Sequence, residues 1–215
     1  MTTNPIGLPL HHLWVKTLTI GATTLNETDV IDLVQSGNAT LIGAAPSVTN
    51  LSCTIRRISN EFTLTFSLTG ASITVTDGAG SGSHGALKIF DFAESGLLIT
   101  GCRQNYTAFA EGAALTGAAG DAVFKIGVGT VAIAAAADAA LGATNKDVGG
   151  EVSVTLSGGT GVGTAHTGSA LTLDGTSTAV DLYLNWSGSA ATIDANSTIS
   201  VTGSITVTGT LLGDD

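Results

Sequence analysis

The feature that most constrains this fold is a strict alternation of apolar and hydroxyl side chains in EFTLTFSLTG (61–70). Phe62, Leu64, Phe66 and Leu68 are separated by Thr63, Thr65, Ser67 and Thr69. Successive side chains of a β-strand point to opposite faces, so this period of two predicts a strand with one buried and one solvated face. Such strands are typical of antiparallel sheets. Gly70-Ala71 then predicts a short turn into SITVTD (72–77), which would complete a hairpin.

Further strand patterns recur at intervals of roughly 8–15 residues, separated by Gly, Ser and Asp. The clearest are LSCTIRRIS (51–59), ALKIFDFAESGLLITGC (86–102), EVSVTLSGG (151–159), AVDLYLNWSG (179–188) and TISVTGSITVTGTLL (198–212). Single apolar faces are formed by Val180, Leu182, Leu184 and Trp186, and by Ile199, Val201, Ile205, Val207 and Leu211. GVGTVAIAAAADAAL (127–141) fits a short helix as well as a strand. The pattern predicts an all-β antiparallel sandwich, jelly-roll-like, although an immunoglobulin-like strand order fits it too.

The chain divides into an arm and one domain. Residues 1–45 are expected to form an extended N-terminal arm with one or two short strands, and residues 46–215 the β-sandwich domain. WVKTLTI (14–20) fits a strand, while ETDVIDLVQSG (27–37) fits a strand or a short helix. The N-terminus lacks a basic start followed by an apolar run, so we expect no export signal. No apolar stretch reaches the 18 residues or more of a membrane span.

The charge excludes one class of partner. The formal net charge is −10, with only seven Lys and Arg. A nucleic-acid-binding protein needs a basic surface to displace counterions, so we expect no nucleic-acid partner. All seven basic residues lie at or before Lys146, whereas the last third, 147–215, has none. This asymmetry favours solubility or, as the sharper hypothesis, an acidic face matched to a basic partner.

No enzyme chemistry is predicted, so the catalytic, metal and cofactor residues are expected to be none. The histidines, His11, His12, His84 and His166, lack the neighbours of a catalytic triad or a zinc site. Asp77 and Asp174 each precede Gly, which indicates turns before it indicates calcium ligands. GVGT, at 127–130 and 161–164, lacks the Lys and Ser or Thr of a phosphate loop and is interpreted as a turn.

Two cysteines, Cys53 and Cys102, are too few for a disulfide framework. Both lie in strand-like, apolar segments, which favours buried free thiols over a bridge. Arg56 and Arg57 are adjacent on one strand, so one of them is expected to point inward or toward a subunit contact, the alternative being two exposed arginines on an edge strand.

The two tryptophans are expected to differ. Trp186 continues the apolar face of its strand and is predicted to lie in the core, whereas Trp14 lies in the arm and is a candidate interface anchor. With Lys16 beside it in the arm, the candidate interface residues are Trp14, Lys16, Arg56 and Arg57.

Three stretches resemble a family of small β-rich proteins of tailed phages. They are SITVTDGAGSGSHGALKIFDFAESGLLITG (72–101), FKIGVGTVAIAAAADAALGATNKD (124–147), and LDGTSTAVDLYLNWS (173–187) leading to STISVTGSITVTGT (197–210). The family is that of jelly-roll-type capsid decoration, or cement, proteins. The resemblance implies a homotrimeric structural subunit made in the host cytoplasm, which binds the major capsid protein on the outer surface of the virion.

Other functions fit the same composition. A carbohydrate-binding or adhesion module would also be a Thr- and Gly-rich sandwich without catalytic groups, but it would expose aromatic side chains to sugars. A tail or fibre subunit is the second alternative, although fibres tend to be longer and repetitive. An enzyme is the weakest of the three.

Overall fold

The computed structural model describes residues 17–20, 23–26, 42–58, 60–77, 82–111, 122–134, 141–157, 160–162, 166–167, 170–188 and 196–213. Within these ranges the protein is all-β, as the alternation predicted. The single helical element among them is a 3-10 turn, η3 (Ala143–Asn145). Most of the expected arm, including 1–16 and 27–41, and the alanine run 135–140 lie outside the described residues.

The strands form two sheets of very different size. A two-stranded sheet consists of β1 (Thr17–Ile20) and β2 (Thr23–Asn26). A twelve-stranded sheet contains β3 (Gly43–Ala44), β4 (Leu51–Ile58), β5 (Glu61–Asp77), β6 (Ser83–Phe92), β7 (Ser95–Glu111), β8 (Ala122–Gly129), β9 (Gly150–Ser157), β10 (Thr160–Val162), β11 (His166–Thr167), β12 (Leu171–Gly175), β13 (Asp181–Gly188) and β14 (Ser197–Gly213).

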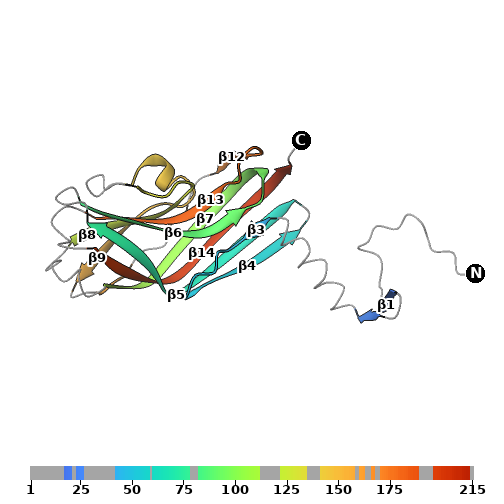
Figure 1. Ribbon diagram of the computed structural model, residues 1–215, viewed down its shortest axis with the longest axis horizontal. Helices are drawn as coiled ribbons and strands as arrows, with labels where there is room; N and C mark the ends of the chain where they lie inside the picture. Colours follow the sequence, from blue (N-terminus) through green and yellow to red (C-terminus); the bar gives the residue numbers. More distant parts are fainter. Residues whose placement is uncertain are drawn as a thin grey trace, which may run out of the picture.

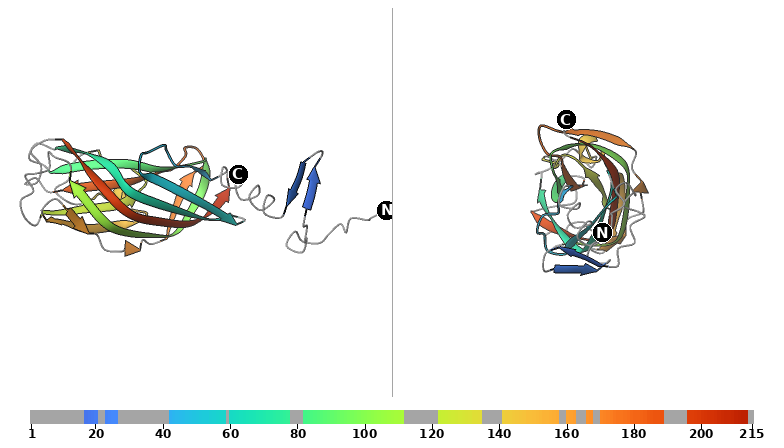
Figure 2. Two further views of the ribbon diagram at one scale, coloured as in Figure 1. Left: turned by 90° about the horizontal axis from the view of Figure 1, so that it is seen from below. Right: turned by 90° about the vertical axis from the view of Figure 1, so that its right-hand side faces the viewer.

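The twelve-stranded sheet curls into two facing layers (Figures 1 and 2). Layer A has the order β4-β5-β14-β7, with β10, β11 and β12 along the free side of β7. Layer B has the order β3-β6-β13-β8-β9. The pairing is nested, because β5 pairs with β14, β6 with β13, β7 with β10 to β12, and β8 with β9. First-with-last nesting of antiparallel strands is the jelly-roll arrangement, which confirms the predicted fold class.

On one side of the sandwich, β9 of layer B pairs with β10 of layer A. On the other side, β5 of layer A pairs with β6 of layer B only at Thr76 and Asp77. Farther along, β5 pairs instead with β4 and β6 with β3, so β4 and β3 are the two ends of the sheet.

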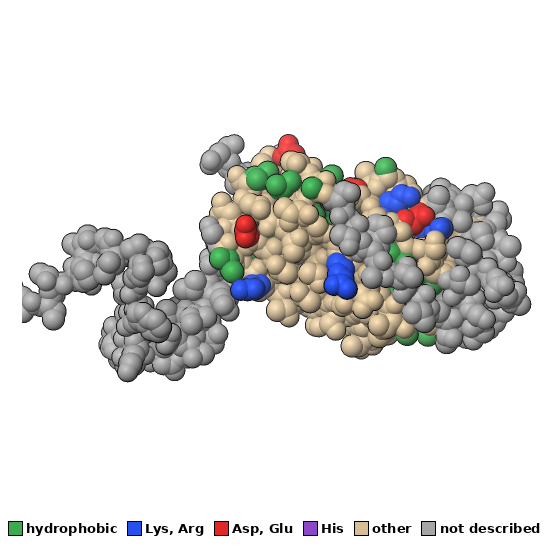
Figure 3. All heavy atoms as spheres, turned by 180° about the vertical axis from the view of Figure 1, so that it is seen from behind, with side chains coloured by type: hydrophobic (Ala, Val, Ile, Leu, Met, Phe, Trp, Pro, Cys, Tyr) green, Lys and Arg blue, Asp and Glu red, His purple; other side chains and the backbone are tan. Residues whose placement is uncertain are grey.

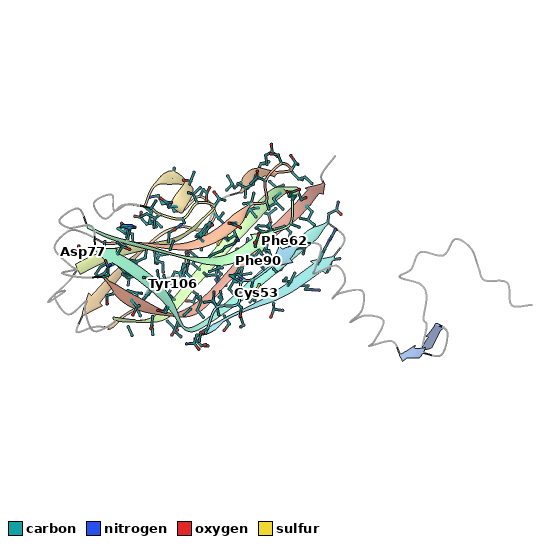
Figure 4. All side chains as sticks on the ribbon, in the orientation of Figure 1. Cys53, Phe62, Asp77, Phe90 and Tyr106 are labelled. Carbon is teal, nitrogen blue, oxygen red and sulfur yellow. The ribbon has the colours of Figure 1, made fainter. Side chains whose placement is uncertain are left out.

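The core between the layers is rich in aromatic rings. Phe62, Phe90 and Phe92 meet edge to face, with ring centroids 4.9–5.6 Å apart within two pairs. Trp186 stacks on Phe124 at 4.8 Å, which confirms its predicted place in the core. Figure 4 shows these inward side chains between the layers, with Phe62 and Asp77 toward opposite ends of β5. All the residues of the predicted apolar face of β14 are buried: Ile199, Val201, Ile205, Val207 and Leu211.

The hairpin predicted at Gly70-Ala71 is wrong. Residues 61–77 form one strand, and Gly70 is a β-bulge with φ +86°. In the register with β14, Thr69 pairs with Thr202 and Ala71 with Val201, so Gly70 is left over. One extra residue reverses the side-chain phase, which is why the buried positions change from even numbers up to Leu68 to odd numbers from Ala71. The strand 61–77 instead forms a hairpin with β4, and the turn lies between Ile58 and Glu61.

The turn predicted at GVGT (127–130) is also wrong, because Gly127 to Gly129 form the end of β8. Backbone of residues 130–134 and 141–149, the described parts of the segment 130–149, lies against the outer side of layer B at this point. A Cβ atom on Gly129 would lie 2.2 Å from the carbonyl carbon of Asn145, and one on Gly127 would lie 2.6 Å from the Gly150 oxygen. The glycines therefore allow a close approach of backbone to a strand.

One polar side chain crosses the core. Gln104 is fully buried on β7 and accepts a 2.6 Å hydrogen bond from the Tyr106 hydroxyl. Its amide donates to the carbonyl oxygens of Gly149 and Gly150, at the start of β9. Gln104 thus joins layer A to layer B through hydrogen bonds inside an otherwise apolar core, where such bonds are strong.

The nesting also removes the basis for a separate acidic side. β14 lies between β5 and β7, and β13 between β6 and β8. The last third of the chain is therefore interleaved with the first half in both layers. In the described strands, therefore, the charge asymmetry along the sequence is not matched by a division of the sandwich into a first-half face and a last-third face.

Candidate functional site

The described residues contain no cluster of three or more His, Cys, Asp and Glu side chains able to hold a metal ion. Asp174 forms the turn predicted for it, since its carboxylate accepts hydrogen bonds from the backbone N–H and the hydroxyl of Thr176. In the part of the chain that the structure describes, no helix is long and apolar enough to cross a membrane.

The outer face of layer A consists mainly of serine and threonine side chains. Strand register places Ser52, Ser67, Ser204 and Asn105 in one row and Thr54, Thr65, Thr206 and Arg103 in the next. Figure 3 shows one face of the molecule on which uncharged polar side chains and backbone cover most of the surface and charged groups are few. Threonine suits such a face because its branched Cβ favours a strand while its hydroxyl remains hydrated.

Among the described residues, three large apolar side chains are well exposed, namely Ile58 (59%), Val131 (48%) and Leu212 (57%). Ile58 and Leu212 lie on the outer side of layer A and Val131 lies outside layer B, all toward one end of the sandwich, which we call the C-terminal end. The Leu211 N–H donates to the Asn60 carbonyl, which ties the end of β14 to the β4–β5 turn. The strand registers of β6, β13 and β8 bring Val131 to the same end.

The chain enters the sandwich at this end too. The Ala93 N–H donates at 2.8 Å to the carbonyl of Ile42, the first described residue after the gap at 27–41. The C-terminal end therefore combines the arm connection, the last strand and the exposed apolar groups. Figure 1 shows it at the right of the sandwich, beside the C-terminus.

A shallow groove lies at the C-terminal end of layer A. Its volume is about 300 Å³, and its walls include Arg56, Ile58, Glu61, Thr100 and Thr208. The hydroxyls of Thr100 and Thr208 are hydrogen-bonded at 3.1 Å. The groove offers one cation, one carboxylate, hydroxyls and an apolar side chain, which suits a polar peptide contact better than a buried small molecule.

Two of the four predicted interface residues, Arg56 and Arg57, lie among the described residues. Trp14 and Lys16 lie outside the described residues. Arg56 is exposed on the outer side of β4, whereas Arg57 faces the inner side and is half-buried. The alternation thus confirms that one of the two arginines points inward, and it assigns that place to Arg57. Arg56, at the groove, becomes the better candidate for a surface contact.

An ion-pair cluster that sequence analysis missed lies on the outer side of layer B. Lys88 Nζ is 2.7 Å from Asp181 Oδ1 and 3.0 Å from Asp91 Oδ2, and the Tyr183 hydroxyl donates to Asp181 Oδ2 at 2.7 Å. Burial alone raises the pKa of the Asp181 carboxyl, but the hydrogen bonds from Lys88 and Tyr183 outweigh it and lower the pKa below its usual value. The four residues come from β6 and β13, so only the pairing of these strands could reveal the cluster.

A second ion pair fastens the segment 130–149 to layer B. Lys146 Nζ is 2.9 Å from Glu151 Oε2, and Lys125 Nζ is 3.3 Å from Glu151 Oε1. Burial raises the pKa of the Glu151 carboxyl, but hydrogen bonds from Lys146 and from the Leu141 N–H together lower it overall. The first cluster pairs one cation with two carboxylates and the second pairs two cations with one carboxylate. Every charged group in them has a partner, which indicates structural roles.

Both cysteines are free thiols, as predicted. Cys53 lies on β4 and Cys102 on β7, with β5 and β14 between them. Three strand spacings amount to roughly 14 Å, too far for a disulfide. Burial raises the pKa of each thiol to about 12.

The raised pKa values predict inert thiols. Four units above pH 8, the thiolate fraction is roughly 10⁻⁴, and the thiolate is the reactive form. We expect a thiol reagent at pH 8 to label neither cysteine within minutes in the folded protein, and both once urea unfolds it. Rapid labelling of the native protein, with the site found by mass spectrometry, would contradict this burial.

The comparisons with known proteins leave the family open. A scan against protein-family models finds no match to this chain. A search of curated proteins finds no match either.

Proposed function

We propose that this protein is a structural virion subunit that decorates the outer capsid surface of a tailed phage. In this role it binds the major capsid protein, associates as a homotrimer and stabilises the head lattice. A capsid repeats one shallow site many times, so a symmetric subunit gains avidity from several weak contacts.

The C-terminal end of the sandwich carries the proposal. It brings together the arm connection, the exposed Ile58, Val131 and Leu212, and the groove beside Arg56. A subunit that binds a capsid through one end needs contact residues at that end and a surface without binding groups elsewhere. The hydroxyl-covered outer face of layer A is such a surface. The jelly-roll order agrees with the resemblance of 72–101, 124–147, 173–187 and 197–210 to decoration proteins.

The position of the aromatic residues weighs against a carbohydrate-binding module. All six phenylalanines, Trp186 and Tyr106 are buried. Of the described aromatic side chains only Tyr183 is partly exposed, and its hydroxyl is bound to Asp181. The described surface therefore offers no platform of stacked rings for a sugar.

The test is binding to undecorated capsids of the phage that encodes the protein. We expect the full chain to co-sediment with them and to saturate at a fixed number of copies per capsid. Deletion of residues 2–20 is expected to abolish binding and to leave the circular dichroism spectrum of the sandwich unchanged. Failure of the full chain to bind would refute the proposed function, and normal binding after the deletion would refute the role of the arm.

A matched pair of arginine variants tests the groove. Arg56→Ser removes a cation at the C-terminal end, whereas Arg103→Ser removes one from the middle of the same face. We expect the first to weaken capsid binding by roughly 3–10-fold, with a salt-dependent association rate, and the second to change it little. Equal effects would mean that the arginines act only through net charge.

A further inference from the structure

The edge of β4 is an open strand edge. β4 pairs with β5 through a continuous register from Leu51 to Ile58, without a bulge, and it is the last strand of the sheet. Within the described residues, its one main-chain hydrogen bond outside this ladder joins the Leu51 N–H to the Val48 carbonyl. Among the described residues, this edge of eight residues is free and is a template for another strand. β4 has neither a proline nor a bulge, and the only protecting charges on it, Arg56 and Arg57, lie near its end, which leaves the edge from Leu51 to Ile55 open.

The inner side of β4 is incompletely covered. Leu51, Cys53 and Ile55 pack against the core but remain partly exposed, whereas their partners on β5, Leu68, Phe66 and Leu64, are buried. The difference arises because β5 has a neighbour on each side and β4 has only one. An added strand would cover these three side chains and complete the layer.

The same chain contains strands that lack a sheet. β1 and β2 pair only with each other, with Thr17 opposite Asn26 and Ile20 opposite Thr23. An isolated two-stranded hairpin is marginally stable at best in water, because it needs a third strand or a packed face. Each strand of the hairpin has one edge that its partner does not use.

Three observations point to a hairpin from another copy. Within one chain, the β1–β2 sheet and the twelve-stranded sheet share no strand pairing. The fifteen residues 27–41 that follow the hairpin can span at most about 50 Å, enough to reach a neighbouring subunit. This segment begins with Glu27 and Asp29, whereas β4 carries the exposed Arg56, so the charges are complementary.

We propose that the free edge of β4 accepts the β1–β2 hairpin of a second copy of this chain as added strands. The contact is heterologous, since the hairpin of one subunit meets β4 of the next, and three such contacts close a ring. Main-chain hydrogen bonds supply the affinity, as in other cases of strand addition. The exchange requires no capsid and is a property of the protein in solution.

The test is photo-cross-linking between isotopically distinct copies. A benzophenone amino acid replaces the exposed Thr54 on β4 in the full chain, and ¹⁴N and ¹⁵N preparations are mixed, unfolded and refolded together before irradiation. We expect cross-links from position 54 to peptides within residues 17–26, about half of them joining different isotopes. The same probe at Asn105, on an inner strand of the layer, is expected to give no such link.

A variant pair separates the hairpin from the rest of the arm. Leu18→Pro removes a strand donor within β1 and is expected to lower the cross-link yield by at least about tenfold, whereas Leu10→Pro, outside the hairpin, leaves it unchanged. Cross-links confined to single isotopes would show a hairpin folded onto its own β4 and overturn the proposal, as would an absence of cross-links to 17–26. A chain that decorates capsids without these cross-links would overturn only this inference, and a cross-linked chain that binds no capsid would overturn only the proposed function.

Discussion

Replacement of Trp186 by alanine is expected to lower the free energy of unfolding by about 3–5 kcal/mol, the usual loss for a large aromatic side chain in a core. Trp186 is fully buried and lies 4.8 Å from Phe124 and 6.0 Å from Phe109, measured between ring centroids. It therefore joins β13 and β8 of layer B to β7 of layer A. Urea denaturation, with the slope compared between variants, measures the loss.

The matched control is Tyr183→Phe on the same strand. Tyr183 faces outward, and the substitution removes only its partly exposed hydrogen bond to Asp181. We expect a loss below about 1 kcal/mol for this variant. Similar losses for the two variants would contradict the assignment of opposite faces along β13.

Replacement of Asn185 by alanine is expected to cost about 2–4 kcal/mol, because buried or half-buried backbone groups lose their partner. The Asn185 side chain accepts from the Ile133 N–H at 2.9 Å and donates to the carbonyls of Val131 and Asn145 at 3.0 and 2.8 Å. It is fully buried between layer B and the segment 130–149. The loss is expected to appear first as faster amide hydrogen exchange in that segment.

Asn145→Ala is the control for this variant. Its exposed side chain makes one hydrogen bond, to the Val131 carbonyl, at 2.9 Å. We expect its removal to cost less than about 1 kcal/mol and to leave amide exchange at Ile133 unchanged. If Asn185→Ala behaves like Asn145→Ala, the segment is held by its ion pairs to Glu151 instead.

The sequence carried enough information for the strand class and for the faces of most strands. A period of two records which side of a strand meets the core, and this is a local property of each segment. Phe62 to Leu68, the apolar face of β14 and the core position of Trp186 follow from it directly. Even the bulge at Gly70 is encoded, as a change from even to odd buried positions, although a turn was the wrong interpretation of it.

Glycine shows a different limit of the sequence. GVGT resembles a turn because glycine is common in turns, but Gly127 and Gly129 lie within β8. Glycine is required at these two positions because the backbone of Asn145 and Gly150 approaches too closely for a Cβ atom. Nothing within the motif itself indicates a segment that packs on it from outside.

Tertiary structure alone decided which strands are neighbours. β5 pairs with β14, for example at Phe66 and Ile205, and β6 pairs with β13. The strands of each pair are far apart in the sequence and meet only because the fold nests them. Backbone hydrogen bonds are alike in every strand, so alternation specifies a face without specifying a partner. The salt bridge of Lys88 with Asp181, the groove beside Arg56 and the open edge of β4 all depend on those partners. The sequence by itself therefore determined the layers' inner and outer sides, and the pairing of distant strands determined the surfaces available for function.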